Sequence, residues 1–284
     1  MPVTLEELAL GSMPPLHQPI GVFDSGVGGL TVLKALRARL PGRDFVYLGD
    51  TARVPYGRKP REMVAGFAGG IARFLIDQGA QAVVIACNTA SSAALPDLAQ
   101  QLEVPVWGVI EPGVEAATRA TRGGRVGVIG TRGTIASGAY QRRLEVRGFA
   151  VWAQACPMFV HVVEEGLAGA PEAEVLTRHY LEERPDLDAL ILGCTHYPLL
   201  KDVVARVVGS GVTLVDSAEA TAEVVSSALA DLPGRTGRVR HFVTGDVAAY
   251  EHTAQVIGGV DGEVLHLDVA ELARFEARAG VSRG

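Results

Sequence analysis

Hydrophobic and polar positions follow two patterns along this chain. Short apolar runs rich in β-branched residues, each ended by glycine or polar residues, alternate with longer stretches in which apolar residues recur at helical spacing. Uninterrupted apolar runs are typical of strands buried on both faces of a parallel sheet, and the stretches between them are typical of βαβ connections. The expected strands are Ile20–Asp24, Phe45–Leu48, Ala82–Ala86, Val106–Ile110, Arg125–Gly130, Ala150–Gln154, Ala189–Leu192, Val212–Val215, Arg238–Thr244 and Glu263–Leu267. The pattern therefore predicts an α/β protein with Rossmann-like open sheets.

Ten strands are many for one twisted sheet in a chain of 284 residues, so we expect two sheets of about five strands each. Two strand ends also resemble each other: residues 82–89 and 189–196 each run from an apolar strand into a cysteine and then polar residues. This duplication predicts two similar α/β domains facing one cleft, because ligands bind beyond the carboxyl ends of strands in open α/β sheets. The predicted limits are 1–18 for an N-terminal extension outside the core, 19–112 with 221–284 for the first domain, and 113–220 for the second.

Composition narrows the classes of function. The 26 Lys and Arg and 32 Asp and Glu give a formal net charge of −6 with no basic face, so nucleic acid is not an expected partner. The sequence has no apolar run of about 18 residues and no secretory layout at its start, so we expect no membrane partner and a cytoplasmic location. Three cysteines are too few for a disulfide framework and fit a reducing compartment, where thiols stay free for chemistry.

Cys87 and Cys194 are the strongest indication of chemistry. A single cysteine at the end of a buried strand is usually a small core hydrophobe. These two occupy matching contexts, each followed by hydrogen-bonding side chains, Asn88–Thr89 and Thr195–His196, so packing alone explains them poorly. Cys156 lacks such neighbours and is expected to be structural.

The segment Phe23–Gly29 follows the first strand and opens a helix, where backbone N–H groups attract an anion. A dinucleotide site is one alternative, since Asp50 lies near the place of a ribose-binding acid. However, Thr31 stands where that fingerprint needs a small residue, and Asp24 would repel a pyrophosphate. A glycine-rich turn without a ligand is a further alternative.

Zinc is another alternative, because Cys87, Cys194, His196 and Asp24 are acceptable ligand types. The chain lacks a short Cys-x-x-Cys or His-x-x-x-His pair to anchor the ion, so we expect no metal site.

Two smaller clusters have open interpretations. Backbone N–H groups in the Pro-Tyr-Gly turn at Tyr56 and Gly57 are suited to hold a carboxylate, but a structural turn fits equally well. Glu164 follows an apolar run and either enters a cleft or ends a helix as a solvated acid. His161 receives no role.

Several motifs together resemble the glutamate racemases of the aspartate/glutamate racemase superfamily. They are Gly21–Leu30, Gly49–Thr51, Pro55–Gly57, Ala86–Ala90, Gly108–Gly113 and Gly193–Leu199, in family order. His196 favours glutamate racemases, since aspartate racemases usually have glutamate at that position. The chain departs from the family in its N-terminal extension and in His161, where an apolar residue or proline is commoner.

The resemblance implies an isomerase that interconverts L- and D-glutamate without a cofactor or metal and supplies D-glutamate for peptidoglycan. It implies that Cys87 and Cys194 are the catalytic pair and that Glu164 assists near the second cysteine. It also implies substrate-binding or assisting roles for Asp24, Ser25, Tyr56, Gly57, Asn88, Thr89, Thr195 and His196. An aspartate racemase and a non-catalytic amino-acid-binding protein are the alternatives, and the oligomeric state stays open, with a homodimer as one candidate.

Racemisation without a cofactor requires one group to remove the α-proton and another to return a proton on the opposite face. One thiol must start as thiolate, and a free thiol has a pKa of about 8.5, so a neighbour has to help. His196 is the neighbour of Cys194, and by resemblance Asp24 assists beside Cys87. Because no arginine lies in the matched motifs, we expect backbone N–H groups and hydroxyls to hold the side-chain carboxylate of glutamate.

Overall fold

The computed structural model describes residues 16–230 and 236–277. Residues 1–15, most of the predicted extension, lie outside the described residues. Leu16 packs partly buried against the core, and the backbone N–H of His17 donates to Asp44 at 2.9 Å. Leu16 and His17 thus belong to the packed part of the chain.

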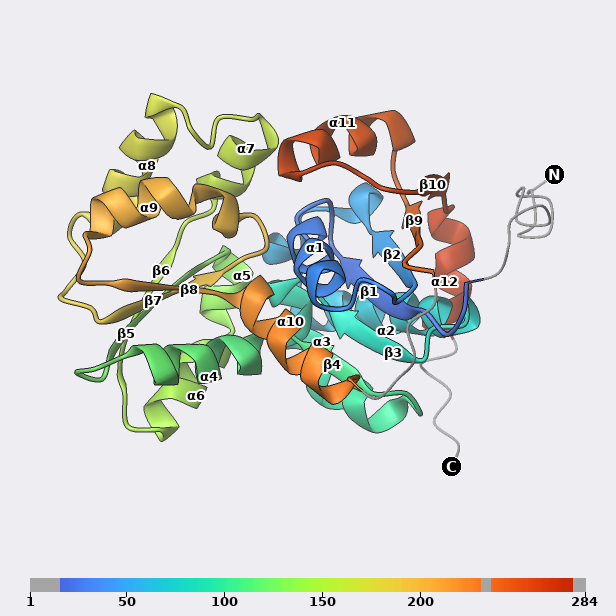
Figure 1. Ribbon diagram of the computed structural model, residues 1–284, viewed down its shortest axis with the longest axis horizontal. Helices are drawn as coiled ribbons and strands as arrows, with labels where there is room; N and C mark the ends of the chain where they lie inside the picture. Colours follow the sequence, from blue (N-terminus) through green and yellow to red (C-terminus); the bar gives the residue numbers. More distant parts are fainter. Residues whose placement is uncertain (1–15, 231–235, 278–284) are drawn as a thin grey trace.

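Two parallel sheets form the framework (Figure 1). Their strands are β1 (Ile20–Asp24), β2 (Phe45–Gly49), β3 (Ala82–Ile85), β4 (Val106–Gly108), β5 (Arg125–Gly130), β6 (Ala150–Ala155), β7 (Ala189–Gly193), β8 (Thr213–Asp216), β9 (Val239–Val243) and β10 (Glu263–His266). The first sheet has the order β10-β9-β2-β1-β3-β4 and the second β6-β5-β7-β8. All ten expected strands are present, and β1, β2, β3 and β7 are buried along their whole length, which explains their uninterrupted apolar sequence.

Two details of the strand prediction are wrong. Among the described residues the sheets contain six and four strands where about five each were expected, because β9 and β10 return to the first sheet beside β2. The fourth strand ends at Gly108 rather than Ile110, because Val109 has helical backbone angles and Ile110 begins the next helix.

Helices cover both faces of each sheet. On the first sheet, α1 (Leu30–Arg39), α10 (Ser217–Ala228) and α11 (Val247–Ile257) pack on one face, and α2 (Arg61–Asp77), α3 (Asn88–Gln101) and α12 (Val269–Ala277) on the other. On the second sheet, α4 (Ile110–Ala120) and α6 (Ala139–Val146) face α7 (Met158–Glu164), α8 (Pro171–Leu181) and α9 (Lys201–Val208) across the strands. The short helices are η2 (Thr51–Arg53), η3 (Tyr56–Arg58), α5 (Arg132–Ala136) and η4 (Tyr197–Leu200). Within the described ranges, no helix has the length and apolar character to cross a membrane.

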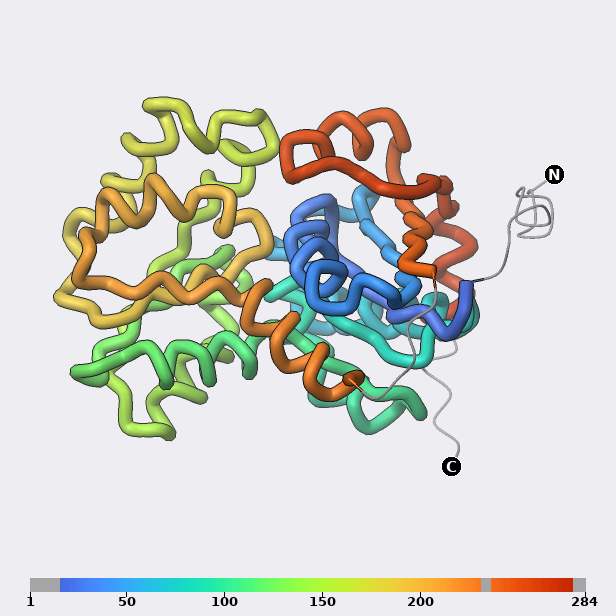
Figure 2. Tube along the Cα trace, viewed as in Figure 1, coloured from blue at the N-terminus to red at the C-terminus, as the bar shows by residue number. Residues whose placement is uncertain are grey.

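The chain passes from the first sheet to the second after β4 and returns after β8 (Figure 2). At the return, α10 packs against both α1 and α4, and near the opposite edge α7 contacts α11. We keep 19–112 with 221–284 and 113–220 as our proposal for the two domains.

Candidate functional site

A cavity of about 170 Å³ lies where the carboxyl ends of the two sheets face each other, as expected for open α/β sheets. Neighbouring strands end at the same height in each sheet: Asp24 pairs with Gly49 in the first sheet, and Gly130 pairs with Gly193 in the second. The lining residues are Ser25, Gly26, Val54, Pro55, Tyr56, Gly57, Cys87, Asn88, Thr89, Thr131, Val160, His161, Glu164, Cys194, Thr195 and His196. Both cysteines of the duplicated strand ends therefore line one cavity. Of the residues predicted for the site, Asp24 is the exception.

Cys87 lies at the N-terminus of α3, between β3 and the helix. Its sulfur accepts a hydrogen bond from the Ala90 backbone N–H at 3.5 Å, and its thiol donates to Ser25 Oγ at 3.6 Å. Burial, and then the negative charge of Asp24, raises the pKa of Cys87 to about 12. Cys87 is thus a protonated thiol at neutral pH.

Cys194 has a different partner. Its sulfur lies 3.9 Å from Nδ1 of His196, and Nε2 of His196 lies 2.9 Å from Oε1 of Glu164, at the end of α7. Burial opposes protonation of His196, but the hydrogen bonds and charges of Cys194 and Glu164 outweigh it and raise the pKa of His196 to about 10. His196 is therefore an imidazolium at neutral pH, held between the sulfur and the carboxylate.

The two cysteines are succeeded by different local structures. After Cys87 a helix of 14 residues begins at once, so backbone N–H groups point toward the sulfur. After Cys194 the chain forms the short η4 turn before α9, and the nearby positive group is the His196 side chain. Similar sequences thus provide two unlike electrostatic environments.

Asp24 lies behind the cavity wall rather than on it. Its Oδ2 accepts from the Gly26 backbone N–H at 2.9 Å, while its Oδ1 is buried without a hydrogen-bond partner among the described residues. Burial raises the pKa of Asp24, although the positive His196 and three backbone N–H groups oppose the shift.

The glycines after Asp24 allow close packing between the two sheets. A Cβ on Gly28 would lie 2.4 Å from Thr195 Oγ1 of the second half, and one on Gly29 would lie 2.4 Å from the Asp24 Cβ within the first. The Thr31 hydroxyl donates to the Thr195 carbonyl at 2.9 Å across the same contact. Packing against the Thr195 turn accounts for this glycine-rich segment.

Asn88 and Thr89 meet side chains of the second sheet. The Tyr140 hydroxyl donates to Asn88 Oδ1 at 2.7 Å, which leaves the buried Nδ2 without a partner among the described residues. Thr89 Oγ1 lies 3.0 Å from Thr131 Oγ1 and 3.2 Å from Thr134 Oγ1. The two polar side chains after Cys87 are thus fixed from across the cavity.

Tyr56 presents its ring and backbone to the cavity, because its hydroxyl donates to Asp50 in the opposite direction. Gly57 is packed closely against the second sheet: a Cβ there would lie 3.1 Å from Thr131. The predicted Pro-Tyr-Gly turn therefore lines the cavity mainly with backbone and ring surface.

Sequence reasoning missed Thr131, Val54 and Val160, and it gave no role to His161, which lines the cavity from α7. Thr131 carries a usable signal, because it directly follows β5 and the rule about carboxyl ends applies to that strand as well. Val54 and Val160 have no such signal, since single valines in a loop and a helix are common.

Cys156 lies apart from the cavity, fully buried in the core of the second sheet, where its thiol contacts the Gln154 carbonyl at 3.7 Å. Among the residues that the structure describes, no group of three or more His, Cys, Asp or Glu side chains is arranged to hold a metal ion.

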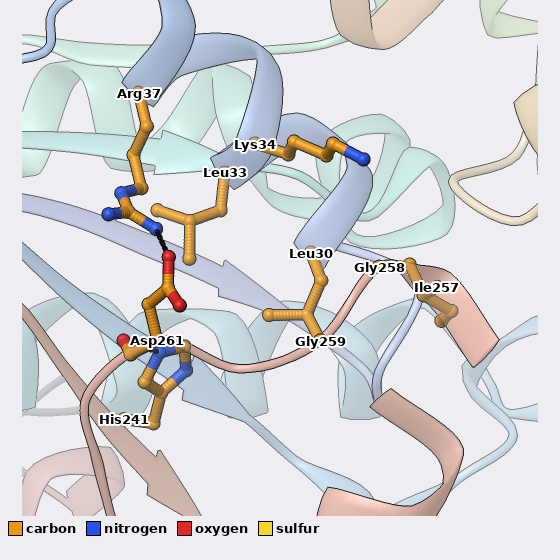
Figure 3. Close-up of a pocket in the computed structure, with 9 residues that line it drawn as sticks. All are labelled: Leu30, Leu33, Lys34, Arg37, His241, Ile257, Gly258, Gly259 and Asp261. Atoms are coloured by element: carbon orange, nitrogen blue, oxygen red, sulfur yellow. Dashed lines mark hydrogen bonds and ion pairs between the residues drawn. The ribbon is translucent and has the colours of Figure 1, made fainter. Parts of the chain in front are cut away.

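Another cavity, of about 130 Å³, lies between α1 and the segment that joins α11 to β10 (Figure 3). Arg37 and Asp261 form an ion pair of 2.9 Å there, and Lys34 points along its rim. None of the predicted site residues lines it, so the chemistry is expected in the cavity with the cysteines.

Comparison with known proteins agrees with this geometry. Residues 27–225 match the model of the Asp/Glu/Hydantoin racemase family. The chain is 56% identical over 260 residues to a glutamate racemase of Thermus thermophilus, covering 89% of this chain and 98% of the relative.

Solved structures give the same result. A Thermus thermophilus glutamate racemase in complex with β-chloro-D-alanine superposes with a TM-score of 0.83 at 54% identity, over 91% of this chain and 100% of the other. A Francisella tularensis glutamate racemase in complex with D-glutamate superposes with a TM-score of 0.80 at 34% identity, over 89% and 97%. These comparisons confirm the resemblance inferred from the motifs. The chain is an amino-acid racemase, which is an isomerase, and it belongs to the Asp/Glu/Hydantoin racemase family.

Proposed function

We propose that this chain interconverts L- and D-glutamate without a cofactor, using Cys87 and Cys194 as the two acid/base groups. The observation that carries the proposal is that both thiols line one cavity of about 170 Å³, each from a different sheet. Two groups on opposite walls are what proton removal from one face and proton return to the other require. Glutamate is proposed as the substrate because the relatives are named glutamate racemase.

Two unpartnered polar atoms, one directly behind the cavity wall and one on a residue that lines it, support an α-amino acid as the ligand. Asp24 Oδ1 is a buried acceptor and Asn88 Nδ2 a buried donor, and neither has a partner among the described residues. Buried polar atoms without partners are costly, so a ligand that satisfies them gains affinity. An α-ammonium next to Asp24 and an α-carboxylate next to Asn88 match these atoms.

The electrostatics support Cys194 as the first base for L-glutamate. The His196 imidazolium stabilises a thiolate at Cys194, whereas Cys87 is a thiol at neutral pH. Cys194 then removes the α-proton of L-glutamate and becomes a thiol, and Cys87 gives its proton to the opposite face and becomes a thiolate. The product is D-glutamate, and the reverse reaction runs from the exchanged protonation state, with Ser25, Asn88, Thr89 and Thr195 holding the substrate and Glu164 holding His196.

The γ-carboxylate of glutamate is held by the backbone around Gly57 and by the hydroxyls of Ser25 and Thr195. No arginine is among the described residues that line this cavity. In the cell, the product supplies peptidoglycan synthesis in the cytoplasm, and a homodimer is the proposed assembly.

Single serine variants test the mechanism. Cys87→Ser and Cys194→Ser should each lose about 10³-fold or more in both directions, because a hydroxyl cannot supply an anion near neutral pH. Cys156→Ser is the matched control and should stay active. D-to-L and L-to-D turnover and deuterium incorporation at the α-carbon in D₂O are measured with glutamate and with aspartate. Near-normal racemisation by either of the first two variants refutes the two-thiol mechanism, and faster turnover of aspartate refutes the substrate.

A further inference from the structure

A second space, of about 210 Å³, adjoins the cavity with the cysteines and leads outward from it. We call it the vestibule. The two spaces share Pro55, Gly57, Thr131, Val160 and His161 as lining residues, so they lie side by side. The vestibule adds three residues that the inner cavity lacks, Pro157 and two arginines, Arg58 and Arg132.

The two arginines come from different sheets. Arg58 ends η3 after β2, and Arg132 begins α5 after β5. These two short elements are in contact, since a Cβ on Gly133 would lie 3.0 Å from the Gly57 Cα. The positive charges therefore stand where the two halves of the molecule meet at the mouth of the cavity.

No residue in the described ranges neutralises either guanidinium. Both side chains are exposed, and neither makes an ion pair or side-chain hydrogen bond with another residue that the structure describes. None of the described residues lining the vestibule is acidic. The vestibule is therefore positively charged, although the whole chain has a formal net charge of −6.

An anion that enters the inner cavity meets the charges of Asp24 and Glu164, one behind the wall and one on it. Charges of one sign that line an opening attract the opposite charge and raise its local concentration. We propose that Arg58 and Arg132 form an electrostatic entrance that draws amino acids of net negative charge into the cavity and favours them over neutral amino acids of similar size. This inference rests on the proposed function, because it takes a dicarboxylic amino acid as the substrate.

The test is the double variant Arg58→Gln/Arg132→Gln. At low ionic strength its KM for L- and D-glutamate should rise by about three- to tenfold, with kcat within about twofold of wild type, because the arginines act on capture and not on chemistry. Added NaCl should raise the KM of the wild type and change that of the variant much less. The matched control, Arg61→Gln/Arg206→Gln, removes the same two charges from exposed positions outside both spaces and should keep the wild-type KM.

Each outcome decides the proposal. An unchanged KM with an unchanged salt response overturns it, as does a fall in kcat at constant KM, or an equal rise of KM in the control. If neither the wild type nor the control racemises glutamate, the proposed function fails by itself. The dissociation constant of glutamate, measured by calorimetry at low and high salt, then tests the entrance without turnover, with glutamine as the neutral comparison.

Discussion

Replacing Gly28 by alanine should disable the site while the fold persists. The new Cβ would lie 2.4 Å from His196 Cε1 and from Thr195 Oγ1. Neither neighbour can turn away easily, because Glu164 holds His196 at 2.9 Å and Thr31 holds the Thr195 carbonyl at 2.9 Å. Ordinary contact begins at 3.4 Å, so the turn that carries both side chains must retreat by about 1 Å.

The size of the effect can be worked from that displacement. A misplacement of about 1 Å costs on the order of 10²-fold in rate, and overpacking costs about 1–3 kcal/mol of stability. We therefore expect kcat to fall by about 10²-fold in both directions, while the variant still unfolds cooperatively with a Tm lowered by roughly 5 °C. Turnover is followed by circular dichroism of glutamate, and unfolding by far-ultraviolet circular dichroism.

Gly66→Ala is the matched control, because a Cβ at this position in α2 meets no atom within 4 Å. That variant should keep the wild-type kcat and gain about 0.5–1 kcal/mol, since alanine is favoured over glycine inside a helix. If Gly28→Ala keeps kcat within a few-fold of wild type, the close approach does not position His196 and the reasoning fails.

Three further changes have defined outcomes. Burial lowers the pKa of His241 from 6.5 to about 4, so between these pH values only the unfolded chain binds the proton. The free energy of unfolding of the wild type should therefore fall by about 3 kcal/mol as the pH falls through that range. His241→Phe should lose less of this free energy, as measured by urea titrations at each pH. Tyr140→Phe removes the 2.7 Å hydrogen bond to Asn88 and should lower kcat/KM about tenfold, and an unchanged kcat/KM would contradict the positioning of that amide. Glu164→Gln removes a charge that raises the pKa of His196, so the alkaline limb of the kcat/KM profile should move to lower pH, and an unmoved limb would exclude this role.

The strands were predictable because strands that are buried on both faces have uninterrupted apolar sequences. β1 and β5 begin and end at the predicted residues, and both lie inside their sheets, where every residue except Arg125 is buried. Strand count by itself suggested about five strands in each sheet, whereas the predicted domain limits, with 221–284 joined to 19–112, placed the last two strands with the first four, as in the observed sheet. Which sheet the last two strands join depends on long-range packing, which a local pattern does not record.

The cavity was predictable as far as strand ends define it. Cys87 and Cys194 stand at such ends, and the motifs around them are specific. The partners that fix the site were not predictable: Tyr140 reaches Asn88 from 52 residues away, and Thr31 reaches Thr195 from 164 residues away. Such contacts depend on the packing of one sheet against the other, and no local pattern contains them.

The unequal surroundings of the two thiols bear on how one site can work in both directions. At Cys194 the protein itself supplies a positive charge through His196. At Cys87 it supplies burial and the negative charge of Asp24, which both oppose a thiolate. On the proposed function, a bound glutamate brings its α-ammonium to Asp24 and cancels the second of these effects, because the two charges then form a pair. The substrate thus provides on one side the positive charge that His196 provides on the other, and the base strength of Cys87 depends on occupancy of the cavity.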